Sequence, residues 1–336
     1  MAVTHGGDIF AVAREHGWNW RDMLDFSASI NPLGPAPGVR QAISDAMDQI
    51  EHYPEREAVP LARALANLWH IDLSQVLLGN GATELIFFLA RTLGETAVTL
   101  AAPVFSEFHR AFPQAHLAEL RNPATWPTTG LLVMTRPANP TGWTLDLAIL
   151  RDWLKTVQNP VLIDESFLDF SGQPSAATLL DEHPQLMILR SLTKFYALPG
   201  LRIGSLIGSP EKVRCWRQQR EPWQVNVFAQ EAALAALADK EHAARSLSFV
   251  QAERQWLLEK LKSLPGVEPV ESDANFLYVR VFCSTQGICK HLLGQKILVR
   301  DCTNWPGLPG QALRVAVRTR PENERLIETW RSCRCE

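Results

Sequence analysis

The residues S-L-T-K-F-Y-A-L-P-G-L-R-I-G at 191–204 directly follow the apolar run 186–189, and the rest of the chain is organised around them. A short apolar run of this kind predicts a buried strand. The hydroxyl, amine and guanidinium groups of this stretch are therefore expected at the end of a strand and in the loop beyond it. Among them, Lys194 and Arg202 carry the charges.

Two hydroxyls, an amine and a guanidinium suit a ligand that carries both a phosphate and an aldehyde. Ser191 and Thr193 offer hydrogen bonds to a phosphate, and Arg202 adds a rigid cationic fork. Lys194 has neutral and aromatic neighbours, among which an amine can lose its proton before forming a Schiff base. The combination predicts pyridoxal phosphate (PLP). A surface lysine beside a salt-bridged arginine also fits, because short motifs match by chance.

Size and composition exclude several classes of protein. The chain has 336 residues, of which 46% are hydrophobic, which allows a sizeable core and two domains. The net charge of -3 offers no electrostatic footprint for nucleic acid or for an acidic membrane surface. The longest apolar stretch, 85–90, is too short to span a bilayer. The first residues lack the basic and apolar regions of a signal peptide, so a cytoplasmic protein is expected.

The six cysteines are scattered, which favours reduced thiols over a disulfide framework. Cys333 and Cys335 stand near the end of the chain and could contribute to metal binding. Two ligands do not make a metal site, so no metal is expected.

Apolar runs alternate with helical patterns through the first part of the chain. Strands are expected at 75–79, 97–103, 131–135 and 161–165, and helices at 39–50 and 61–69. Such alternation predicts a parallel sheet covered on both faces, with ligands at its strand ends. Asp164 ends one strand and is therefore a candidate site residue. The thirty positions from Asp164 to Lys194 leave room for one crossover helix and a further strand.

Two features near predicted strand ends have two interpretations each. The turn before Gly81, Ala82 and Thr83 would point free backbone N–H groups at one spot, which suits a phosphate. A plain connection from strand to helix, capped by Thr83, fits equally well. Phe105 falls just past a strand end, where it would serve as a cofactor platform or, more commonly, as core.

The last part of the chain predicts helices at 210–220 and 225–264 and then a second sheet. Residues 275–281 and 312–318 alternate as strands do, and 297–301 lies between them. Arg300, Arg314 and Arg318 stand in or beside these strands and need anionic partners if they are buried. Protein carboxylates or an anionic substrate would serve.

The first forty residues are rich in loops. Prolines and glycines at 32–38 cannot continue a helix or a central strand. A rigid loop of this kind can hold Asn31 over a pocket, and His5 precedes it. From the residues alone, a structural role is the favoured interpretation of both.

Five motifs occur in an order that carries a resemblance to a known family. They are G-N-G-A-T-E-L at 79–85, R-P-A-N-P-T-G at 136–142, D-E at 164–165, S-L-T-K at 191–194 and G-L-R-I-G at 200–204. Over essentially its whole length the chain resembles the fold-type I PLP enzymes of the aminotransferase superfamily. The resemblance implies an α/β fold, with a large domain built on a mostly parallel sheet between helices and a smaller α+β C-terminal domain. The implied parts are an N-terminal segment at 1–38 that packs with the small domain, a large PLP-binding domain at 39–225 and a small domain at 226–336.

Within that superfamily the chain is similar to the histidinol-phosphate aminotransferases and, more closely, to the L-threonine-O-3-phosphate decarboxylases of cobalamin biosynthesis. The aminotransferases usually have tyrosine where this chain has Phe167 and glycine where it has Arg318. The features shared with the decarboxylases are H-G-G at 5–7, D-F-S-A-S-I-N-P-L-G-P at 25–35, D-E-S-F-L-D-F at 164–170, T-K-F-Y-A-L-P-G-L-R at 193–202, R-D-C-T-N at 300–304 and L-R-V-A-V-R at 313–318.

This similarity implies PLP-dependent decarboxylation of L-threonine O-3-phosphate, a small phosphorylated amino acid, to (R)-1-aminopropan-2-yl phosphate. Serine phosphate is a related substrate that the residues do not exclude. Histidinol-phosphate transamination is the alternative. A PLP-binding regulator is the remote third possibility, because the chain shows no basic helix-turn-helix pattern.

The resemblance also assigns roles to residues at the cofactor. Lys194 would bind the aldehyde as a Schiff base and move protons, and Asp164 would pair with the protonated pyridine nitrogen. Asn139 would bind the 3-oxygen of the ring, and Phe105 would stack on its face. The cofactor phosphate would be held by Gly81, Ala82, Thr83, Ser191, Thr193 and Arg202.

Further roles follow for the substrate and for a partner subunit. Tyr53 resembles a tyrosine that reaches the cofactor phosphate of a second subunit, which implies a homodimer with shared active sites. No role follows for Tyr196, unless it approaches the 3-oxygen in place of the tyrosine missing at 167. The substrate phosphate and carboxylate would contact His5, Asn31, Asn139, Arg300 and Arg314, without an assignment of which arginine binds which anion.

Overall fold

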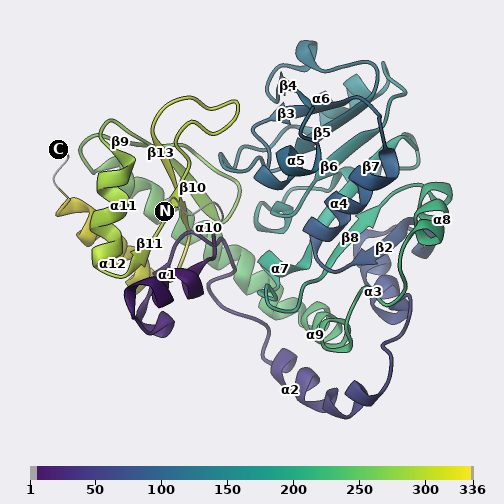
Figure 1. Cartoon of the computed structure of the whole chain (residues 1–336), viewed down its shortest axis with the longest axis horizontal. Helices are drawn as coiled ribbons and strands as arrows, with labels where there is room; N and C mark the ends of the chain where they lie inside the picture. The colour runs from purple at the N-terminus through teal and green to yellow at the C-terminus, as the bar shows by residue number, and fades with distance from the viewer. Residues whose placement is uncertain (1–5, 334–336) are drawn as a thin grey trace.

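The computed structural model describes residues 6–333, which form three β-sheets flanked by helices (Figure 1). The largest sheet has seven strands in the order β2-β8-β7-β6-β5-β3-β4. All neighbouring pairs are parallel except those of β8, which is antiparallel to β2 and β7. The strands are β2 (Val76–Gly79), β3 (Val98–Ala102), β4 (His116–Glu119), β5 (Leu131–Thr135), β6 (Val161–Asp164), β7 (Leu186–Ser191) and β8 (Gly204–Ile207).

The central strands of this sheet are buried on both faces, as their continuous apolar runs require. Every residue of β5, β6 and β7 is buried. Successive residues alternate between two hydrophobic clusters, so that Ile163 packs on one face and Leu162 on the other. Helix α6 (Leu147–Leu154) covers the first face, and α4 (Ala82–Leu93) covers the second. The predicted parallel sheet with covered faces is therefore confirmed.

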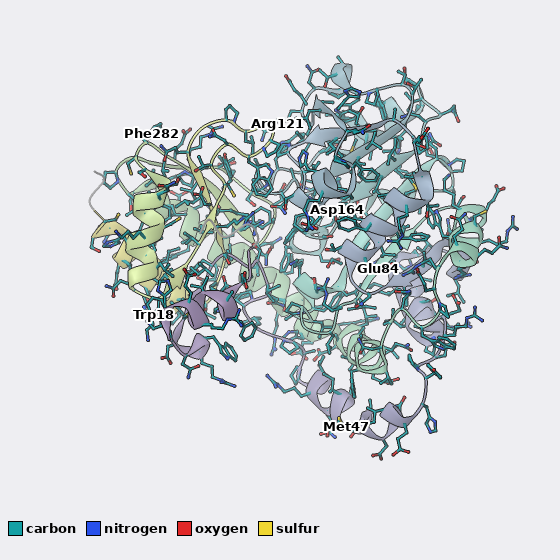
Figure 2. All side chains as sticks on the ribbon, viewed as in Figure 1. Trp18, Met47, Glu84, Arg121, Asp164 and Phe282 are labelled. Atoms are coloured by element: carbon teal, nitrogen blue, oxygen red, sulfur yellow. The ribbon has the colours of Figure 1, made fainter. Side chains whose placement is uncertain are left out.

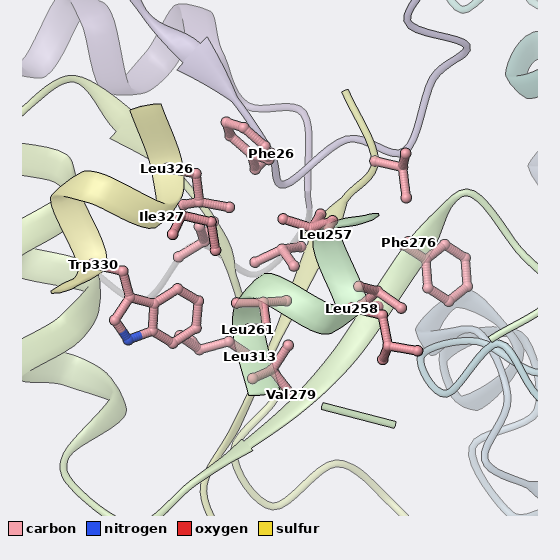
Figure 3. Packing of buried hydrophobic residues seen from close by; sticks show 14 of the residues in the cluster. Phe26, Leu257, Leu258, Leu261, Phe276, Val279, Leu313, Leu326, Ile327 and Trp330 are labelled. Carbon is pink, nitrogen blue, oxygen red and sulfur yellow. The ribbon is translucent and has the colours of Figure 1, made fainter. Parts of the chain in front are cut away.

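The second sheet is antiparallel and has four strands in the order β12-β13-β10-β9. Its core is shared with three helices and includes Phe26, Leu257, Phe276 and Trp330 (Figure 3). The elements concerned are β9 (Val267–Pro269), β10 (Phe276–Val281), β12 (Arg300–Asp301), β13 (Ala312–Ala316), α10 (Lys240–Lys262), α11 (Thr285–Gly294) and α12 (Arg320–Arg331).

The start of the described chain packs beside this smaller sheet. Strand β1 (Leu24–Asp25) pairs in parallel with β11 (Ile297–Leu298), and α1 (Ile9–His16) packs on the same side (Figure 1). The division at 38 and 225 stays a prediction, although the pairing of β1 with β11 agrees in direction with an N-terminal segment that joins the smaller sheet.

The remaining elements connect and cover the sheets. They are the α-helices α2 (Gly38–Asp45), α3 (Val59–Trp69), α5 (Ser106–Ala111), α7 (Leu192–Phe195), α8 (Pro210–Gln219) and α9 (Val227–Ala238), with the 3₁₀ helices η1 (Trp20–Asp22), η2 (Met47–Glu51), η3 (Leu73–Gln75), η4 (Pro123–Thr125), η5 (Leu168–Phe170) and η6 (Ala176–Leu179). No helix within residues 6–333 is long and apolar enough to cross a membrane.

Three expectations need correction. The predicted crossover helix between Asp164 and Lys194 is replaced by η5 and η6, because Gly172 and Pro174 interrupt the segment. The predicted strand at 297–301 is divided between two sheets, as β11 and β12. Cys283 is disulfide-bonded, against the expectation of reduced thiols. Cys335 lies outside the described residues, so the structure does not address metal binding by Cys333 and Cys335.

Candidate active site

A cavity of about 370 Å³ lies where the carboxyl ends of the central strands face the smaller sheet. Asp164 is the last residue of β6 and Ser191 the last residue of β7, and both line the cavity. Asp164 lies in the middle of the molecule, on the side of the large sheet that faces the smaller one (Figure 2). The opposite wall comes from the N-terminal segment and from β12 and β13.

One end of the cavity is shaped for a phosphate. Helix α4 begins at Ala82, and its N-cap Gly81 has φ 82°, a conformation that favours glycine. A side chain at Gly81 would place its Cβ 2.4 Å from Arg202 Nη2, and one at Gly204 would lie 2.6 Å from the backbone nitrogen of Ala82. The closeness of these groups leaves backbone N–H groups and a guanidinium around one point, as anion sites at helix N-termini require.

Hydroxyl groups also line this end of the cavity, where they could donate hydrogen bonds to an anion. Ser191 Oγ and Thr193 Oγ1 lie 2.7 Å apart, and both residues line the cavity with Thr83. The structure thus brings together Ala82, Thr83, Ser191, Thr193 and Arg202 on one wall, with Gly81 directly behind Arg202.

Lys194 lies on the short helix α7, directly after β7, and lines the same cavity. Burial lowers its pKa to about 8, and the positive charges of Arg314 and Arg202 act in the same direction. An amine with this pKa is available in both protonation states near neutral pH, as a nucleophile that also moves protons must be.

Asp164 is buried, and this raises its pKa to about 6. The hydroxyl and the backbone N–H of Ser166 oppose that rise, because both donate hydrogen bonds to Asp164 Oδ1, at 2.5 and 2.9 Å. The next residue, Glu165, turns to the other side of the strand, where it accepts hydrogen bonds from Arg136 at 3.4 Å and Arg190 at 3.1 Å. Asp164 therefore faces the cavity without a cationic partner from that buried network.

Asn139 and Arg314 form one unit on the cavity wall. Arg314 Nη1 donates to Asn139 Oδ1 at 2.7 Å, and its Nη2 donates to the carbonyl of Ser27 at 2.8 Å. Burial lowers the pKa of Arg314 to about 10. Because these bonds fix the guanidinium, it can present its remaining face to a ligand in a set orientation.

Arg300 adds a second cation beside Arg314. The two arginines are direct register partners on the antiparallel strands β12 and β13, and both line the cavity. Like charges directly opposite one another destabilise a sheet. Two neighbouring guanidinium groups on one wall suit an anionic ligand.

The N-terminal segment contributes residues that the sequence did not single out. Ser27, Ala28 and Ser29 line the cavity, together with Gly6. The hydroxyl of Ser29 is buried and has no hydrogen-bond partner among residues 6–333. Alternation along a strand does not explain their placement, because residues 27 and 28 form a bend and all three consecutive side chains line the cavity.

Asn31 does not line the cavity. Its amide donates to the carbonyl of Phe195 at 2.9 Å and to Ser246 Oγ at 2.8 Å, and its backbone N–H donates to the carbonyl of Lys194 at 3.0 Å. Asn31 therefore holds the segment of the lysine in place, and its contact with the substrate stays a prediction. His5 lies outside the described residues.

Four aromatic residues named in the sequence analysis differ in where they lie relative to the cavity. Phe105 lines the cavity at the start of α5, as does Phe167. Tyr53 is 79% exposed and stacks on Trp223, with ring centroids 4.6 Å apart, away from the cavity of its own chain. Tyr196 does not line the cavity either, and its approach to a ring oxygen stays a prediction. Burial and the charge of Asp169 raise the pKa of its hydroxyl.

The donor set fits PLP in each of its parts. The cradle at Gly81 and Arg202 suits a phosphate, the amine of Lys194 suits an aldehyde, and the carboxylate of Asp164 suits a protonated ring nitrogen. Within residues 6–333 no group of three or more histidine, cysteine, aspartate or glutamate side chains is placed to hold a metal ion.

Comparison with known proteins agrees with this chemistry. Residues 21–329 match the family model described as aminotransferase class I and II. The chain is 34% identical to the threonine-phosphate decarboxylase of Salmonella typhimurium, over 98% of this chain and 96% of that protein. It is 32% identical to the histidinol-phosphate aminotransferase of Moorella thermoacetica, over 97% of this chain and 89% of that protein.

A solved structure shows the same fold. The histidinol-phosphate aminotransferase of Sinorhizobium meliloti in complex with pyridoxal-5'-phosphate superimposes with a TM-score of 0.86 at 21% identity. The superposition covers 96% of this chain and 94% of that one. At this level of identity the likeness supports the fold alone.

Proposed function

Because the chain belongs to the aminotransferase class I and II family, we propose that it is a PLP-dependent decarboxylase of L-threonine O-3-phosphate. The products are (R)-1-aminopropan-2-yl phosphate and carbon dioxide, and the reaction supplies the aminopropanol linker of cobalamin. The observation that carries this proposal is the near full-length similarity to a threonine-phosphate decarboxylase, joined to a cavity wall with two adjacent arginines.

Different residues of the cavity would bind the cofactor and the substrate. When bound, PLP supplies an aldehyde that condenses with an amine and a ring that accepts the electron pair of a bond broken at Cα. Lys194 is the amine that would hold it, and Asp164 would hold a proton on the ring nitrogen. The seat formed by Ala82, Thr83 and Arg202, with the hydroxyls of β7 and α7, would bind its phosphate.

Arg314 is the better placed of the two arginines for the substrate carboxylate. Its charge lowers the pKa of Lys194, which indicates that the two groups lie close together at the reacting end of the cavity. Arg300 lies against Trp305, with its guanidinium 5.6 Å from the ring centroid. We therefore assign the carboxylate to Arg314 and the phosphate of the substrate to Arg300.

Two anchors on one small substrate determine which bond at Cα can break. Rotation about Cα is fixed when carboxylate and phosphate are both held, so the phosphate contributes binding energy to orientation. The bond to the carboxylate breaks, carbon dioxide leaves, and Lys194 Nζ donates the proton that replaces it at Cα. The pKa of about 8 leaves this amine able to give the proton near neutral pH.

The deciding experiment is a product assay. The PLP-loaded protein is incubated with L-threonine phosphate, with and without 2-oxoglutarate, and carbon dioxide and aminopropanol phosphate are measured. We expect release of carbon dioxide that does not depend on the keto acid. No release at saturating substrate would overturn the proposal. L-Serine phosphate, which lacks one methyl group, should be discriminated by about 1–3 kcal/mol at most.

Histidinol-phosphate transamination is the second candidate, favoured by the 32% identity to an aminotransferase of that name. It predicts a reaction that consumes 2-oxoglutarate and leaves the cofactor in its pyridoxamine form. The same assay, repeated with histidinol phosphate, separates the two activities by product and by the absorbance of the cofactor.

We also propose that the working enzyme is a homodimer in which Tyr53 reaches the cofactor phosphate of the second subunit. Tyr53 and its stacking partner Trp223 are exposed at 79% and 44%, and Ile50 in the preceding 3₁₀ helix is exposed at 60%. Large apolar side chains this exposed are typical of surfaces that another chain covers.

A further inference from the structure

Ser166 stands out because, among residues 6–333, it is the only one that donates hydrogen bonds to the carboxylate of Asp164. Both of its donors go to the same oxygen, Asp164 Oδ1, with Ser166 Oγ at 2.5 Å and the backbone nitrogen at 2.9 Å. No other residue within 6–333 makes a hydrogen bond to this carboxylate, so Oδ2 has no such partner there. Ser166 is itself buried and lines the cavity beside Asp164.

The position of Ser166 is determined by its neighbour in the chain. The Glu165 backbone N–H donates to the carbonyl of Leu189 on β7 at 2.8 Å, and its carboxylate is held by Arg136 and Arg190. The turn that follows β6 is thus fixed on the side opposite the cavity. The Ser166 hydroxyl is therefore held ready before any ligand binds, which is the arrangement that a supporting residue needs.

Building on the proposed function, we propose that Ser166 is a positioning residue, which holds Asp164 through Oδ1 so that Oδ2 remains to accept the ring N–H of the cofactor. A hydroxyl that donates to a carboxylate fixes its rotation and stabilises the ionised form. An ionised carboxylate is the form that keeps a proton on a ring nitrogen. Ser166 contacts no reacting atom in this role and acts through Asp164.

The charges around Asp164 show why the hydroxyl matters. Burial raises the pKa of Asp164 to about 6, and the charge of Glu165, the residue directly after β6, acts in the same direction. Lys194 on α7 opposes the rise, but its effect is smaller than that of either hydrogen bond from Ser166. The Ser166 hydroxyl is therefore the main group that opposes protonation of Asp164.

The first test uses the protein without cofactor. The Asp164 carboxyl is titrated by ¹³C NMR in protein with labelled aspartate, and Asp164→Asn identifies its signal by removing it. Ser166→Ala keeps the backbone hydrogen bond and loses only the hydroxyl, so the titration midpoint should move to higher pH. Ser166→Thr should restore the midpoint, and Ser166→Cys, a weaker donor, should give an intermediate one.

Ser171→Ala is the matched control. Ser171 lies in the same loop, and its hydroxyl donates to the carbonyl of Leu168 without touching Asp164. Its removal should leave the midpoint where it is in the wild type. A midpoint that Ser166→Ala also leaves unchanged would overturn the proposal.

The second test follows turnover of the holoenzyme against pH. Ser166→Ala should lower kcat/KM about tenfold at pH 6–7, the size of one charge-assisted hydrogen bond. The deficit should shrink as the pH rises, because Asp164 becomes ionised in both proteins. A deficit that is the same at every pH would indicate a structural role and contradict the proposal. Failure of the proposed function is distinguishable, because it would abolish carbon dioxide release while the shifted Asp164 midpoint remained.

Discussion

The two ends of the cavity are built in different ways. At the cofactor end, Asp164, Ser191 and Lys194 come from the ends of two adjacent parallel strands and the turn after them. At the substrate end, Ser29, Arg300 and Arg314 come from opposite ends of the chain and meet only through the smaller sheet and the N-terminal segment.

The difference extends to electrostatics. The cofactor end is supported from within, since Ser166 binds Asp164 and two arginines neutralise Glu165 behind it. The substrate end instead places two arginines in register on neighbouring strands. One end of the cavity thus has its charges compensated by neighbouring side chains, and the other presents two adjacent guanidinium groups. We expect mutations at the two ends to have different effects.

Lys194→Ala should have the largest effect, because no other amine lines the cavity with this depressed pKa within the described chain. We expect turnover of threonine phosphate to fall by about 10⁴-fold or more, with loss of the absorbance of covalently bound cofactor. Borohydride trapping and peptide mapping of the wild type should place the label on residue 194. A label on another lysine would break the assignment of the cofactor end.

Asp164→Ala should come next and should separate binding from rate. The phosphate seat is intact in this variant, so part of the cofactor should remain bound. Turnover should drop by about 10²–10³-fold, as when one preorganised electrostatic partner is removed from an active site. Absorbance measures the bound cofactor and carbon dioxide release measures the rate. Wild-type turnover in this variant would contradict the role of the carboxylate.

At the substrate end, Arg314→Gln and Arg300→Gln should differ from each other. Arg314→Gln should lower kcat as well as kcat/KM, the latter by about a hundredfold, because a buried charged contact worth about 2–5 kcal/mol is lost. Arg300→Gln should mainly raise KM for threonine phosphate. Arg318→Gln is the control, since Arg318 pairs with Glu322 and does not line the cavity. The reverse pattern would exchange the assigned anions.

The sequence predicted the cofactor end well, and the reason is local. Apolar strands followed by polar residues place Asp164 and Lys194 at neighbouring strand ends, and the glycine turn before Ala82 signals a helix N-terminus. The strand-to-helix pattern needs no knowledge of contacts between distant segments. The prediction of secondary structure was wrong where the local pattern was weak. The segment after Asp164 forms 3₁₀ helices in place of the predicted helix.

The substrate end could be predicted only in part, because its contacts join segments far apart in the chain. The sequence indicated that Arg300 and Arg314 need anionic partners if they are buried. That the two residues lie opposite each other became known only from the pairing of β12 with β13. Ser29, from the same loop as Asn31, was not among the predicted site residues. The turn at Asn31–Gly34 directs the asparagine toward Phe195 and Ser246, which no pattern in the sequence revealed.

The pH dependence of PLP uptake should show how far the two ends are coupled. The neutral amine of Lys194 reacts with the aldehyde, so below its pKa of about 8 the uptake rate should rise about tenfold per pH unit and then level off. Burial is the main cause of the low pKa, and Arg314 contributes. Arg314→Gln should therefore move the curve to higher pH. An unmoved curve would show that the two ends titrate independently.

Tyr53 should give the smallest single effect and tests whether the cofactor end is completed by a second chain. Removing one hydroxyl, as in Tyr53→Phe, should weaken cofactor binding by about tenfold or less, the size of one hydrogen bond. Tyr53 lies away from the cavity of its own chain, stacked on Trp223. A loss of cofactor affinity would therefore not follow from the contacts within one subunit.

Hybrid dimers test which subunit's site Tyr53 serves, provided that Tyr53→Ala alone has measurably reduced activity. In a dimer of one Lys194→Ala subunit and one Tyr53→Ala subunit, sharing across the interface puts both lesions in one site and leaves the other site intact. Mixing the two purified variants, with subunit exchange followed by differently tagged chains, should restore up to half of the wild-type activity per hybrid dimer. If Tyr53 served its own subunit, each site of the hybrid would carry one lesion, and the activity would stay at the level of the Tyr53→Ala subunit alone.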